Sequence, residues 1–407
     1  MTKSFNYQLS TEFKPKSLAD TSLFKPIKVG NMNLQHRAVL APLTRFRNHI
    51  NSIPNPEAMG MYYGQRSSRP GTLVITEATI VSAAAGGYDT APGIYNQEQI
   101  DAWSKIFKRV HDNNSYVYLQ LWSLGRQSDP ANLKKIGKPF VSASDVYSDD
   151  RGITSEGVIA EDGAIAVNNE LRPMTIPEIK QYVNDYAQAA RNSLAAGADG
   201  VEVHCGNSYM LNQFLDISSN LRTDEYGSQT LENRARFALE CIDAVVEAVG
   251  ADKVGVRFAP YGRFGGMSGS DDLTAIALYA YIFAELEKRA QQGKRVSYIH
   301  LVQARMTDFN INENDESAKF DTEFVYKIWK GVVMKAGAYA TDPAAVRREV
   351  EVGQTLIAYG RYFISNPDLP DRLALGKPLT KYVRDSFYLP DPIAGYVDYP
   401  TYKQQDL

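Results

Sequence analysis

The sequence has few cysteines and no long apolar run. Cys205 and Cys241 are too few for a disulfide framework, a cysteine-rich zinc site or a cysteine-ligated iron–sulfur cluster. The chain contains no run of about 18 apolar residues, so the sequence predicts no membrane span. The first residues lack the apolar core of a secretory signal. The 44 Lys and Arg against 47 Asp and Glu leave a net charge of −3, which favours neither nucleic acid nor a membrane as partner. We expect a cytoplasmic protein without a metal site.

The composition that remains is that of a globular protein. Residues of the AVILMFWYC group make up 44% of the chain and charged residues 22%. Tyrosine occurs 25 times and histidine only five times. Tyrosine offers flat apolar area with one hydroxyl, which suits stacking against planar ligands. Most of these tyrosines should nevertheless complete the core and the surface.

Short β-rich runs alternate with helical patterns along nearly the whole chain. Helix starts are visible at Asn96 and at the capping box Thr175–Glu178, and residues 231–249 and 273–292 are amphipathic. Eight strands with helices between them predict an α/β fold, a (β/α)₈ TIM barrel. The predicted strands are Arg37–Pro42, Thr72–Ile80, Tyr116–Trp122, Gly200–His204, Val254–Phe258, Ser297–Val302, Gly331–Lys335 and Thr355–Gly360.

The chain shows no internal boundary. No linker, repeat or low-complexity segment divides it, so we expect a single barrel domain over residues 1–407, with residues 1–20 as an extended N-terminal arm. Residues 128–172 are polar and lack a clear period. They predict a long excursion after the third strand, one of the extra loops at the C-terminal face that carries active sites in such barrels. A doubly wound fold would need a Gly-rich phosphate turn, and the sequence has none.

Strand alternation predicts a polar barrel interior. In the strand that ends at His204, two valines share one face while Glu202 and His204 share the other. Helices cover the outside of a barrel, so the polar residues should point inward, together with Gln120, Trp122 and Arg257 of the neighbouring strands. Buried charges need partners, and we expect Glu202 to pair with Arg257. These side chains at strand ends favour a ligand site that is flat, polar at one edge and apolar above.

His204, Asn207 and Tyr209 follow one another at the end of a strand. Imidazole and amide N–H groups suit gripping one carbonyl or phenolate oxygen from two directions. A tyrosine hydroxyl, with a pKa near ~10, is protonated at neutral pH and can serve as a general acid. These parts suit the reduction of an electron-poor alkene. On spacing alone, a strand-end histidine with a purely structural role is the commoner outcome.

A longer match adds specificity. The run His204–Asp216, followed by Asn220–Gly227 and Glu232–Arg236, resembles the Old Yellow Enzyme family of FMN-dependent ene-reductases. The resemblance extends from about Phe24 to Tyr388 and is nearest the yeast-type branch. Further agreeing segments are Ala41–Arg45, Thr76–Ala78, Ala85–Tyr88, Ala91–Gly93, Gln120–Trp122, Gly255–Arg257, Ala336–Gly337, Tyr359–Arg361 and Ser365–Asp368.

The resemblance implies noncovalently bound FMN. Thr44 should hydrogen-bond the flavin carbonyl beside the reactive nitrogen, and Arg257 should stabilise negative charge on the pyrimidine end of the ring. Glycines after the seventh and eighth strands fit the phosphate position of the barrel. The implied cofactor-binding residues are Pro42, Leu43, Thr44, Ala78, Gln120, His204, Arg257, Gly337, Gly360 and Arg361.

The resemblance also implies a ping-pong NADPH dehydrogenase and ene-reductase. NADPH rather than NADH should reduce the flavin, and an α,β-unsaturated carbonyl compound should then enter the same pocket. His204 and Asn207 should hold its oxygen, and Tyr209 should deliver the proton. Trp122, Phe264 and Tyr388 are implied as substrate-binding residues. The resemblance alone suggests a homodimer.

The sequence departs from the family pattern near the site. Ser208 stands where family members usually carry glycine, and a positive φ there would be costly for serine. Ala338 replaces a frequent asparagine beside the phosphate glycine. Residues 303–305 read Gln-Ala-Arg in place of Glu-Pro-Arg, and the turn after Gly227 is one residue longer. The pocket should therefore differ in detail from that of relatives.

Two other interpretations stay open. One is a flavin-containing protein that binds steroids or phenols with little turnover, since the same oxygen grip suits a phenolate. The other is a flavin-free lyase or aldolase that uses Lys335 at a strand end for Schiff-base chemistry.

Overall fold

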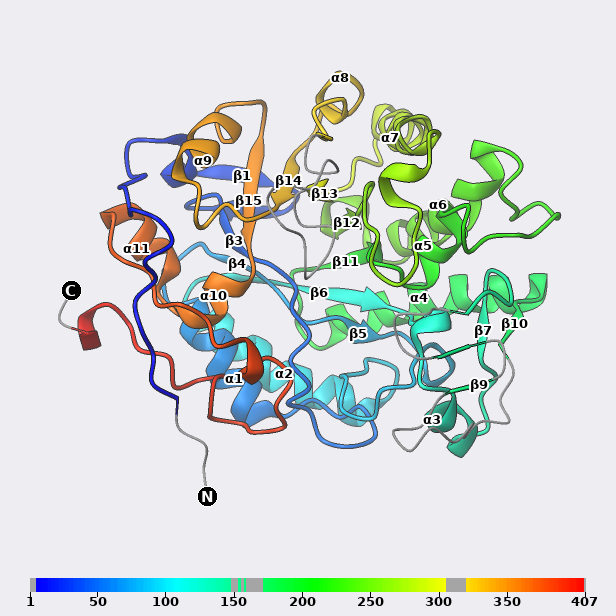
Figure 1. Ribbon diagram of the computed structural model, residues 1–407, viewed down its shortest axis with the longest axis horizontal. Coiled ribbons are helices and arrows are strands. Elements are labelled where there is room, and N and C mark those ends of the chain that lie inside the picture. Colours follow the sequence, from blue (N-terminus) through cyan, green and yellow to red (C-terminus); the bar gives the residue numbers. More distant parts are fainter. Residues whose placement is uncertain (1–4, 148–152, 155–156, 159–170, 305–319, 406–407) are drawn as a thin grey trace.

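Strands occupy the centre of the molecule and helices surround them. The structure is a computed structural model that describes residues 5–147, 153–154, 157–158, 171–304 and 320–405. Its longer helices are α1 (Pro56–Arg66), α2 (Gln97–His111), α4 (Ile176–Ala195), α6 (Leu231–Val249) and α7 (Ala275–Gln291). Shorter ones are α3 (Pro130–Lys135), α5 (Met210–Leu215), α8 (Val325–Ile328), α9 (Pro343–Glu349), α10 (Arg361–Ser365) and α11 (Leu369–Leu375). In Figure 1, α1 and α2 lie below the strands, α4 and α6 to the right, α7 and α8 above, and α9 and α11 to the left.

The strands close into a parallel barrel. Its strands are β3 (Ala38–Leu40), β4 (Leu73–Ile75), β6 (Tyr116–Trp122), β11 (Gly200–Cys205), β12 (Val254–Phe258), β13 (Tyr298–Val302), β14 (Val333–Ala336) and β15 (Thr355–Tyr359). They pair in the order β11-β12-β13-β14-β15-β3-β4-β6, and a β11–β6 pairing closes the ring. This confirms the predicted (β/α)₈ barrel.

One predicted strand is interrupted. Residues 72–80 form β4 and the two-residue β5 (Thr79–Ile80), which also pairs with β6. Between them, the hydroxyls of Thr76 and Thr79 both donate to the carbonyl oxygen of Glu77 at 2.9 Å. The Gln120 amide donates to the Thr76 hydroxyl at 3.1 Å instead of to a strand carbonyl. Side-chain oxygens thus replace part of the strand ladder, and the strand breaks there.

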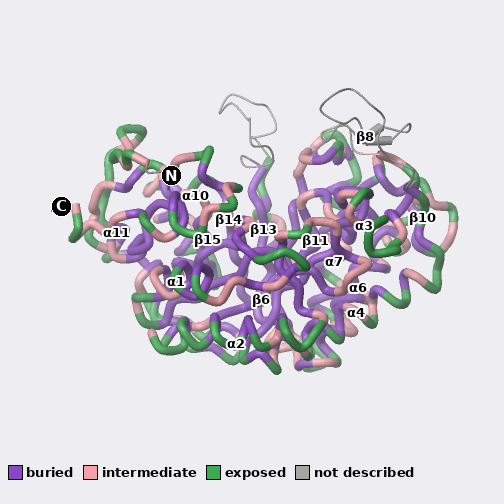
Figure 2. Tube along the Cα trace, turned by 90° about the horizontal axis from the view of Figure 1, so that it is seen from below, coloured by how far each residue is buried: buried purple, intermediate pink, exposed green. Residues whose placement is uncertain are grey.

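Apolar side chains fill the half of the barrel at the strands' amino ends. The interior cluster takes residues from β3, β4, β6, β13, β14 and β15, among them Tyr118, Tyr298 and Met334. The hairpin of β1 (Ile27–Val29) and β2 (Met32–Leu34) adds buried residues to the same cluster and closes this end. A second, larger cluster lies between barrel and helices. Figure 2 shows the strands buried, whereas outer helices such as α2 combine buried and exposed residues. The open end of the barrel is therefore the opposite one, at the strands' carboxyl ends.

Local helix signals predicted from sequence are confirmed. The Thr175 side chain accepts from the Glu178 amide while the Glu178 carboxylate accepts from the Thr175 amide, which is the expected capping box of α4. The Asn96 side chain caps α2 by accepting from the Gln99 amide. Helix α6 has the predicted bounds, 231–249.

Two segments lie outside the barrel repeat. After β6 the described residues form α3, β7 (Val141–Ser142) and β10 (Arg172–Pro173), which pairs with β7, and the two-residue strands β8 (Ile153–Thr154) and β9 (Gly157–Val158) pair with each other. Near the N-terminus, Leu9 bridges to Thr380 and the Ser10 amide donates to the Leu379 carbonyl at 2.7 Å. The division of the chain into one domain with an arm stays a prediction.

Candidate active site

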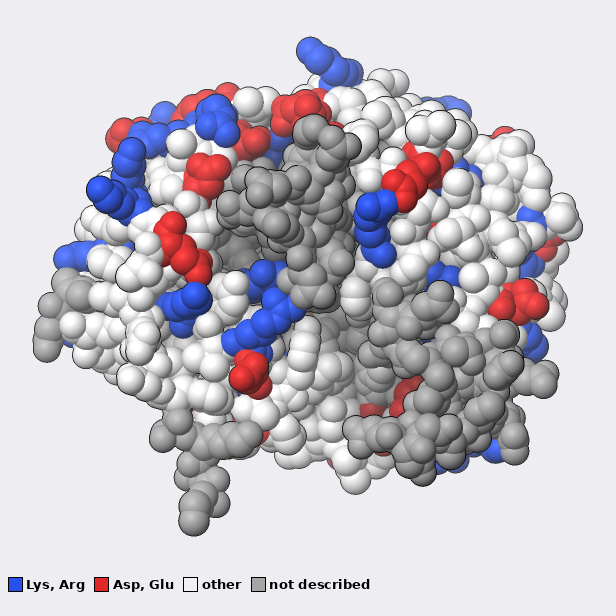
Figure 3. Space-filling model, viewed as in Figure 1, with Lys and Arg blue, Asp and Glu red and all other residues white. Residues whose placement is uncertain are grey.

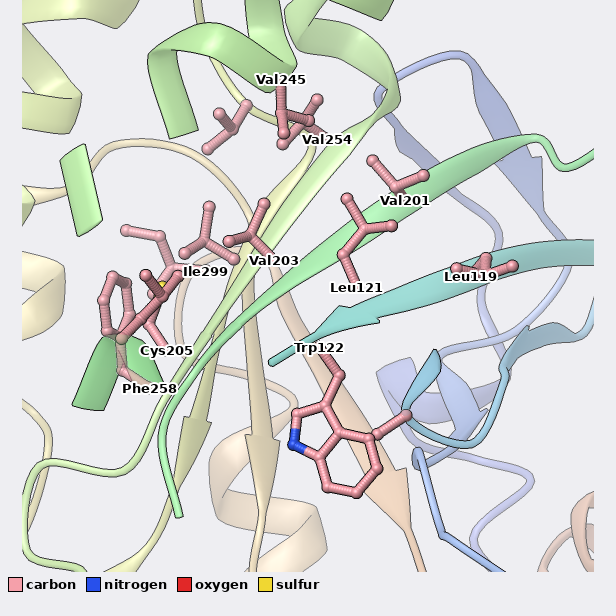
Figure 4. Packing of buried hydrophobic residues seen from close by; sticks show 14 of the residues in the cluster. Leu119, Leu121, Trp122, Val201, Val203, Cys205, Val245, Val254, Phe258 and Ile299 are labelled. Carbon is pink, nitrogen blue, oxygen red and sulfur yellow. The ribbon is translucent and has the colours of Figure 1, made fainter. Parts of the chain in front are cut away.

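Polar side chains line the barrel above its apolar layer, as strand alternation predicts. Val201 and Val203 pack in the outer cluster, whereas Glu202 and His204 face inward. In Figure 4, Leu121 and the two valines lie on the helix side of the strands, and Trp122 lies on the other side. The strand register places His204 directly beside Arg257.

Glu202 does not form the predicted pair with Arg257. One carboxylate oxygen accepts from the Gln120 side-chain amide at 2.7 Å, and the other accepts from His300 Nδ1 at 2.9 Å. The register explains the difference, since Glu202 lies opposite Gly255 on β12, two residues before Arg257. His300 is a residue that the sequence prediction missed, although its inward position on β13 follows from alternation.

The buried ionisable groups of the site shift one another's pKa values. Burial disfavours ionised Glu202, but His300, Arg257 and the Gln120 hydrogen bond together hold the pKa of Glu202 below its usual value. Burial lowers the pKa of Arg257, and Glu202 opposes that shift. Burial, then Arg257 and His300, lower the pKa of His204 well below its usual value. His204 is therefore neutral at pH 7, with one ring nitrogen donating and one accepting.

Several buried polar atoms of the site have no partner among the residues that the structure describes. They are His204 Nδ1, Arg257 Nε, Trp122 Nε1 and His300 Nε2. A buried donor without a partner costs about 1–3 kcal/mol, and more where the group is charged. Native proteins keep few such groups unless a ligand or water satisfies them. These atoms therefore indicate where a polar ligand binds.

The expected cofactor residues lie at neighbouring strand ends. Pro42, Leu43 and Thr44 follow β3, Ala78 lies between β4 and β5, and Gln120 is on β6, and these strands are adjacent in the barrel. His204 and Arg257 continue this row of strand ends, since β11 pairs with β6 and β12 pairs with β11. The residues present thus fit a planar ring that accepts hydrogen bonds along one edge.

The expected phosphate residues also lie together. Gly337 follows β14 and Gly360 follows β15, and these two strands pair with each other. A Cβ at Gly360 would meet only Leu43 Cδ2 at 3.5 Å, so the backbone there is approachable. Arg361 begins α10 and lies half-buried, with its guanidinium 6.0 Å from the Tyr382 ring. Ala338, next to Gly337, has φ +49°, which an asparagine would adopt more readily.

The loop after β11 has the backbone strain expected for its serine. Asn207 has φ +57° and Ser208 φ +66°. The fully buried Ser208 hydroxyl accepts from Gln127 Nε2 at 2.8 Å and donates to the Gly265 carbonyl at 3.2 Å. A Cβ at residue 265 would lie 2.1 Å from that hydroxyl, so Gly265 accommodates the serine. Ser208 thus joins the Tyr209 loop to the loop that carries the half-buried Phe264.

Aromatic rings form a continuous wall from the strand ends to the surface. Tyr209 lies 5.3 Å from the His204 ring. From there each ring contacts the next one. The centroid distances are 4.7 Å for Tyr209–Trp122, 6.0 Å for Trp122–Tyr88, 5.7 Å for Tyr88–Phe46 and 5.6 Å for Phe46–Tyr388. We call Tyr209, Trp122, Tyr88, Phe46 and Tyr388 the aromatic wall. Phe46 was missed from sequence, although it directly follows the Ala41–Arg45 motif.

Lys335 points away from this site. Its ammonium donates to the carboxylates of Glu323 and Glu349 on the outer side of the barrel, the latter at 2.5 Å. Although burial lowers its pKa, Tyr326 and the two carboxylates together raise the pKa of Lys335 above its usual value. A Schiff-base lysine must be neutral and face the ligand, so this geometry argues against the aldolase interpretation.

Acidic and basic side chains are interspersed over the face shown in Figure 3, and several basic ones border its central hollow.

Among the described residues, no helix is both long and apolar enough to cross a membrane. In the same residues, no group of three or more His, Cys, Asp or Glu side chains is arranged to hold a metal ion.

The chain is similar to known flavin enzymes over nearly its whole length. The profile of the NADH:flavin oxidoreductase / NADH oxidase family matches residues 22–380. Enoate reductase 1 of Kluyveromyces lactis is 52% identical, over 96% of this chain and 97% of that protein. A probable NADPH dehydrogenase of Candida albicans is 40% identical, over 95% and 93%. The crystal structure of Old Yellow Enzyme from Pichia sp. AKU4542 has a TM-score of 0.84 at 42% identity and covers 95% of both chains. The predicted resemblance is confirmed: this chain belongs to the NADH:flavin oxidoreductase / NADH oxidase family, that of the Old Yellow Enzymes, and is a flavin-dependent oxidoreductase.

Proposed function

We propose that the protein binds FMN noncovalently and reduces the activated C=C bond of α,β-unsaturated carbonyl compounds with NADPH, by a ping-pong mechanism. Bound FMN would supply the hydride chemistry, accepting hydride from NADPH and returning it to the β-carbon of the alkene. The names of two relatives, an enoate reductase and a probable NADPH dehydrogenase, support this assignment. NADPH and alkene would use the same pocket in turn.

The observation that carries the proposal is a pair of buried polar nitrogens on adjacent strands. His204 and Arg257 are neighbours in the register, and each has a buried nitrogen without a described protein partner. Arg257 is positively charged and would stabilise negative charge on the reduced ring. Together with Gln120, it gives the ligand a polar edge, while the aromatic wall rises beside it.

Each catalytic side chain has a separate task. His204 and Asn207 would donate to the carbonyl oxygen of the alkene and polarise it. Tyr209, two residues further along the loop, would deliver the proton to the α-carbon. Trp122, Phe264 and Tyr388 would shape the substrate pocket. Pro42, Leu43, Thr44, Ala78, Gln120, Gly337, Gly360 and Arg361 would hold the cofactor. The homodimer and the cytoplasmic location stay predictions.

The test is a visible spectrum of the purified protein followed by turnover. We expect a flavin spectrum that bleaches when NADPH is added anaerobically and returns when 2-cyclohexenone is added. FMN should be released on denaturation. A protein that stays colourless after incubation with FMN would refute the proposal.

The same experiment separates the second candidate, a flavin protein that binds phenols or steroids with little turnover. The His204 and Asn207 donors favour it to the same degree, because a phenolate oxygen accepts hydrogen bonds as a carbonyl oxygen does. Bleaching by NADPH without steady-state reduction of 2-cyclohexenone would support this candidate.

A further inference from the structure

Residues 386–395 form a segment after the barrel that reaches back to the aromatic wall. We call it the 386–395 segment. Phe387 is buried, and its neighbour Tyr388 is 56% exposed and lies 5.6 Å from Phe46. Apart from the end of a 3₁₀ turn at Ser386, the segment has no regular structure. Its backbone carbonyls therefore need partners from elsewhere in the molecule.

Two arginines of the loop after β3 supply those partners. Arg47 donates through Nη2 to the Ser386 carbonyl at 2.7 Å, through Nη1 to the Phe387 carbonyl at 2.6 Å, and through Nε to the Asp391 carbonyl at 3.0 Å. Arg45 donates through Nε to the same Phe387 carbonyl at 3.0 Å and through Nη2 to the Gly395 carbonyl at 2.8 Å. Both arginines are buried. The segment is thus attached by side chains that are more than 300 residues away in sequence.

The loop itself divides its side chains between two tasks. Arg45 and Arg47 face the 386–395 segment, while Phe46 between them joins the aromatic wall. Phe46 has φ +55°, a strained conformation for a bulky residue. That turn places the ring against Tyr88 and Tyr388 while the flanking guanidinium groups reach the carbonyls. Backbone strain of this kind persists where the surroundings fix it.

Arginine is chemically suited to this attachment. A guanidinium presents five donors in a rigid planar fork, and three nitrogens of Arg47 each reach a different carbonyl of the segment. Burial, and next the charge of Arg45, lower the pKa of Arg47 to about 10, so the group stays charged at neutral pH. Lysine would keep the charge but not the fork, because its three donors radiate from one nitrogen.

We propose that Arg47, assisted by Arg45, is a positioning residue for the substrate pocket: it holds the 386–395 segment so that Tyr388 stays against Phe46 and completes the aromatic wall. The inference rests on the proposed function only in taking Tyr388 as a pocket residue. Arg47 itself touches neither substrate nor cofactor in this account. Its loss should therefore loosen substrate binding through Tyr388.

A double-mutant cycle tests this. KM for 2-cyclohexenone and the rate of flavin reduction at saturating NADPH are measured for Arg47→Lys, Tyr388→Ala and the double variant. We expect KM to rise about tenfold in Arg47→Lys, since a small displacement of a binding group is costly, with flavin reduction within about twofold of wild type. We expect Tyr388→Ala to raise KM as well, and the double variant to match Tyr388→Ala within about twofold.

A matched control separates positioning from general stability. Arg372 is fully buried and donates to the Pro378 carbonyl at 2.7 Å and to Asp368 at 2.8 Å, but its partners lie outside the 386–395 segment. Arg372→Lys should lower the unfolding midpoint without changing KM. If Arg47→Lys does not fold, Arg45→Lys takes its place in the cycle, because Arg45 donates to the same Phe387 carbonyl.

Two results would overturn the inference and can be told apart. Additive effects of Arg47→Lys and Tyr388→Ala on KM would show that Arg47 does not act through Tyr388. An unchanged KM in Tyr388→Ala would remove Tyr388 from the pocket and the inference with it, while wild-type turnover of 2-cyclohexenone would leave the proposed function standing.

Discussion

Tyr209 packs edge-on against Trp122, with ring centroids 4.7 Å apart and ring planes at 85°. The contact involves the rings, so a phenylalanine at position 209 keeps it and removes only the hydroxyl. We expect Tyr209→Phe to slow alkene reduction by roughly 10²–10⁴-fold, the usual contribution of a general acid. Stopped-flow measurement of the two half-reactions checks this. Reduction of the flavin by NADPH should keep its wild-type rate, and an equal loss in both half-reactions would contradict the assigned role.

The oxygen grip is tested by ligand binding without turnover. In the His204→Ala, Asn207→Ala double variant a phenol loses both donors, so its affinity should fall by about 30–150-fold at roughly 1–1.5 kcal/mol per hydrogen bond. Titration of the flavin absorbance with phenol measures this dissociation constant. Arg372→Lys is a suitable control, since Arg372 binds Asp368 and the Pro378 carbonyl and leaves both donors in place. Unchanged phenol affinity in the double variant would refute the proposal that His204 and Asn207 hold the ligand oxygen.

Ser208 offers a stability test of the loop beside Tyr209. Ser208→Ala keeps the strain of φ +66° and loses the hydrogen bonds to Gln127 and Gly265. We expect a loss of about 1–2 kcal/mol in the free energy of unfolding. Ser208→Gly loses the same bonds but relieves about 1 kcal/mol of left-handed strain, so it should be the more stable of the two. Thermal unfolding at matched flavin saturation gives the order, and an alanine variant at least as stable as the glycine variant would contradict it.

Glu77 predicts a pH-dependent term in stability. Burial raises the pKa of this carboxyl from 4.5 to about 7, against hydrogen bonds from the Arg45 amide and Asn48 that favour the charged form. Because the folded pKa lies above the unfolded one, the stabilisation is complete below pH 4.5 and is lost as the pH rises through about 7.

Glu77→Gln removes this term. Relative to wild type, the variant should therefore gain stability as the pH rises from 5 to 8, by about 2.5 kcal/mol at 1.36 kcal/mol per pKa unit. Urea unfolding of both proteins at the two pH values measures the difference. A difference that stays constant, or that moves in the other direction, would show that Glu77 is ionised in the folded protein across this range.

The barrel and the inward polar residues could be predicted from local patterns. Alternation along single strands fixes the face on which Glu202, His204 and Arg257 lie, because successive side chains point to opposite sides. Alternation does not give the stagger between strands. The stagger places His204, and not Glu202, beside Arg257, so this neighbour could not be predicted from the sequence pattern.

The parts that sequence reasoning missed depend on contacts between distant segments. Arg45 and Arg47 bind backbone carbonyls of the 386–395 segment. Because every residue has a backbone carbonyl, residue types do not indicate which carbonyls the arginines bind. The interruption of the second predicted strand has a local origin instead, since the hydroxyls of Thr76 and Thr79 donate to the nearby Glu77 carbonyl and compete with the strand ladder.

A crystal structure of the purified protein soaked with phenol tests the central claim most directly. We expect a flavin ring across the carboxyl ends of the strands, between Thr44 and Arg257, with the phenol oxygen within hydrogen-bonding distance of His204 and Asn207 on its open face. A structure in which side chains fill that space, or in which these two groups point elsewhere, would contradict the account.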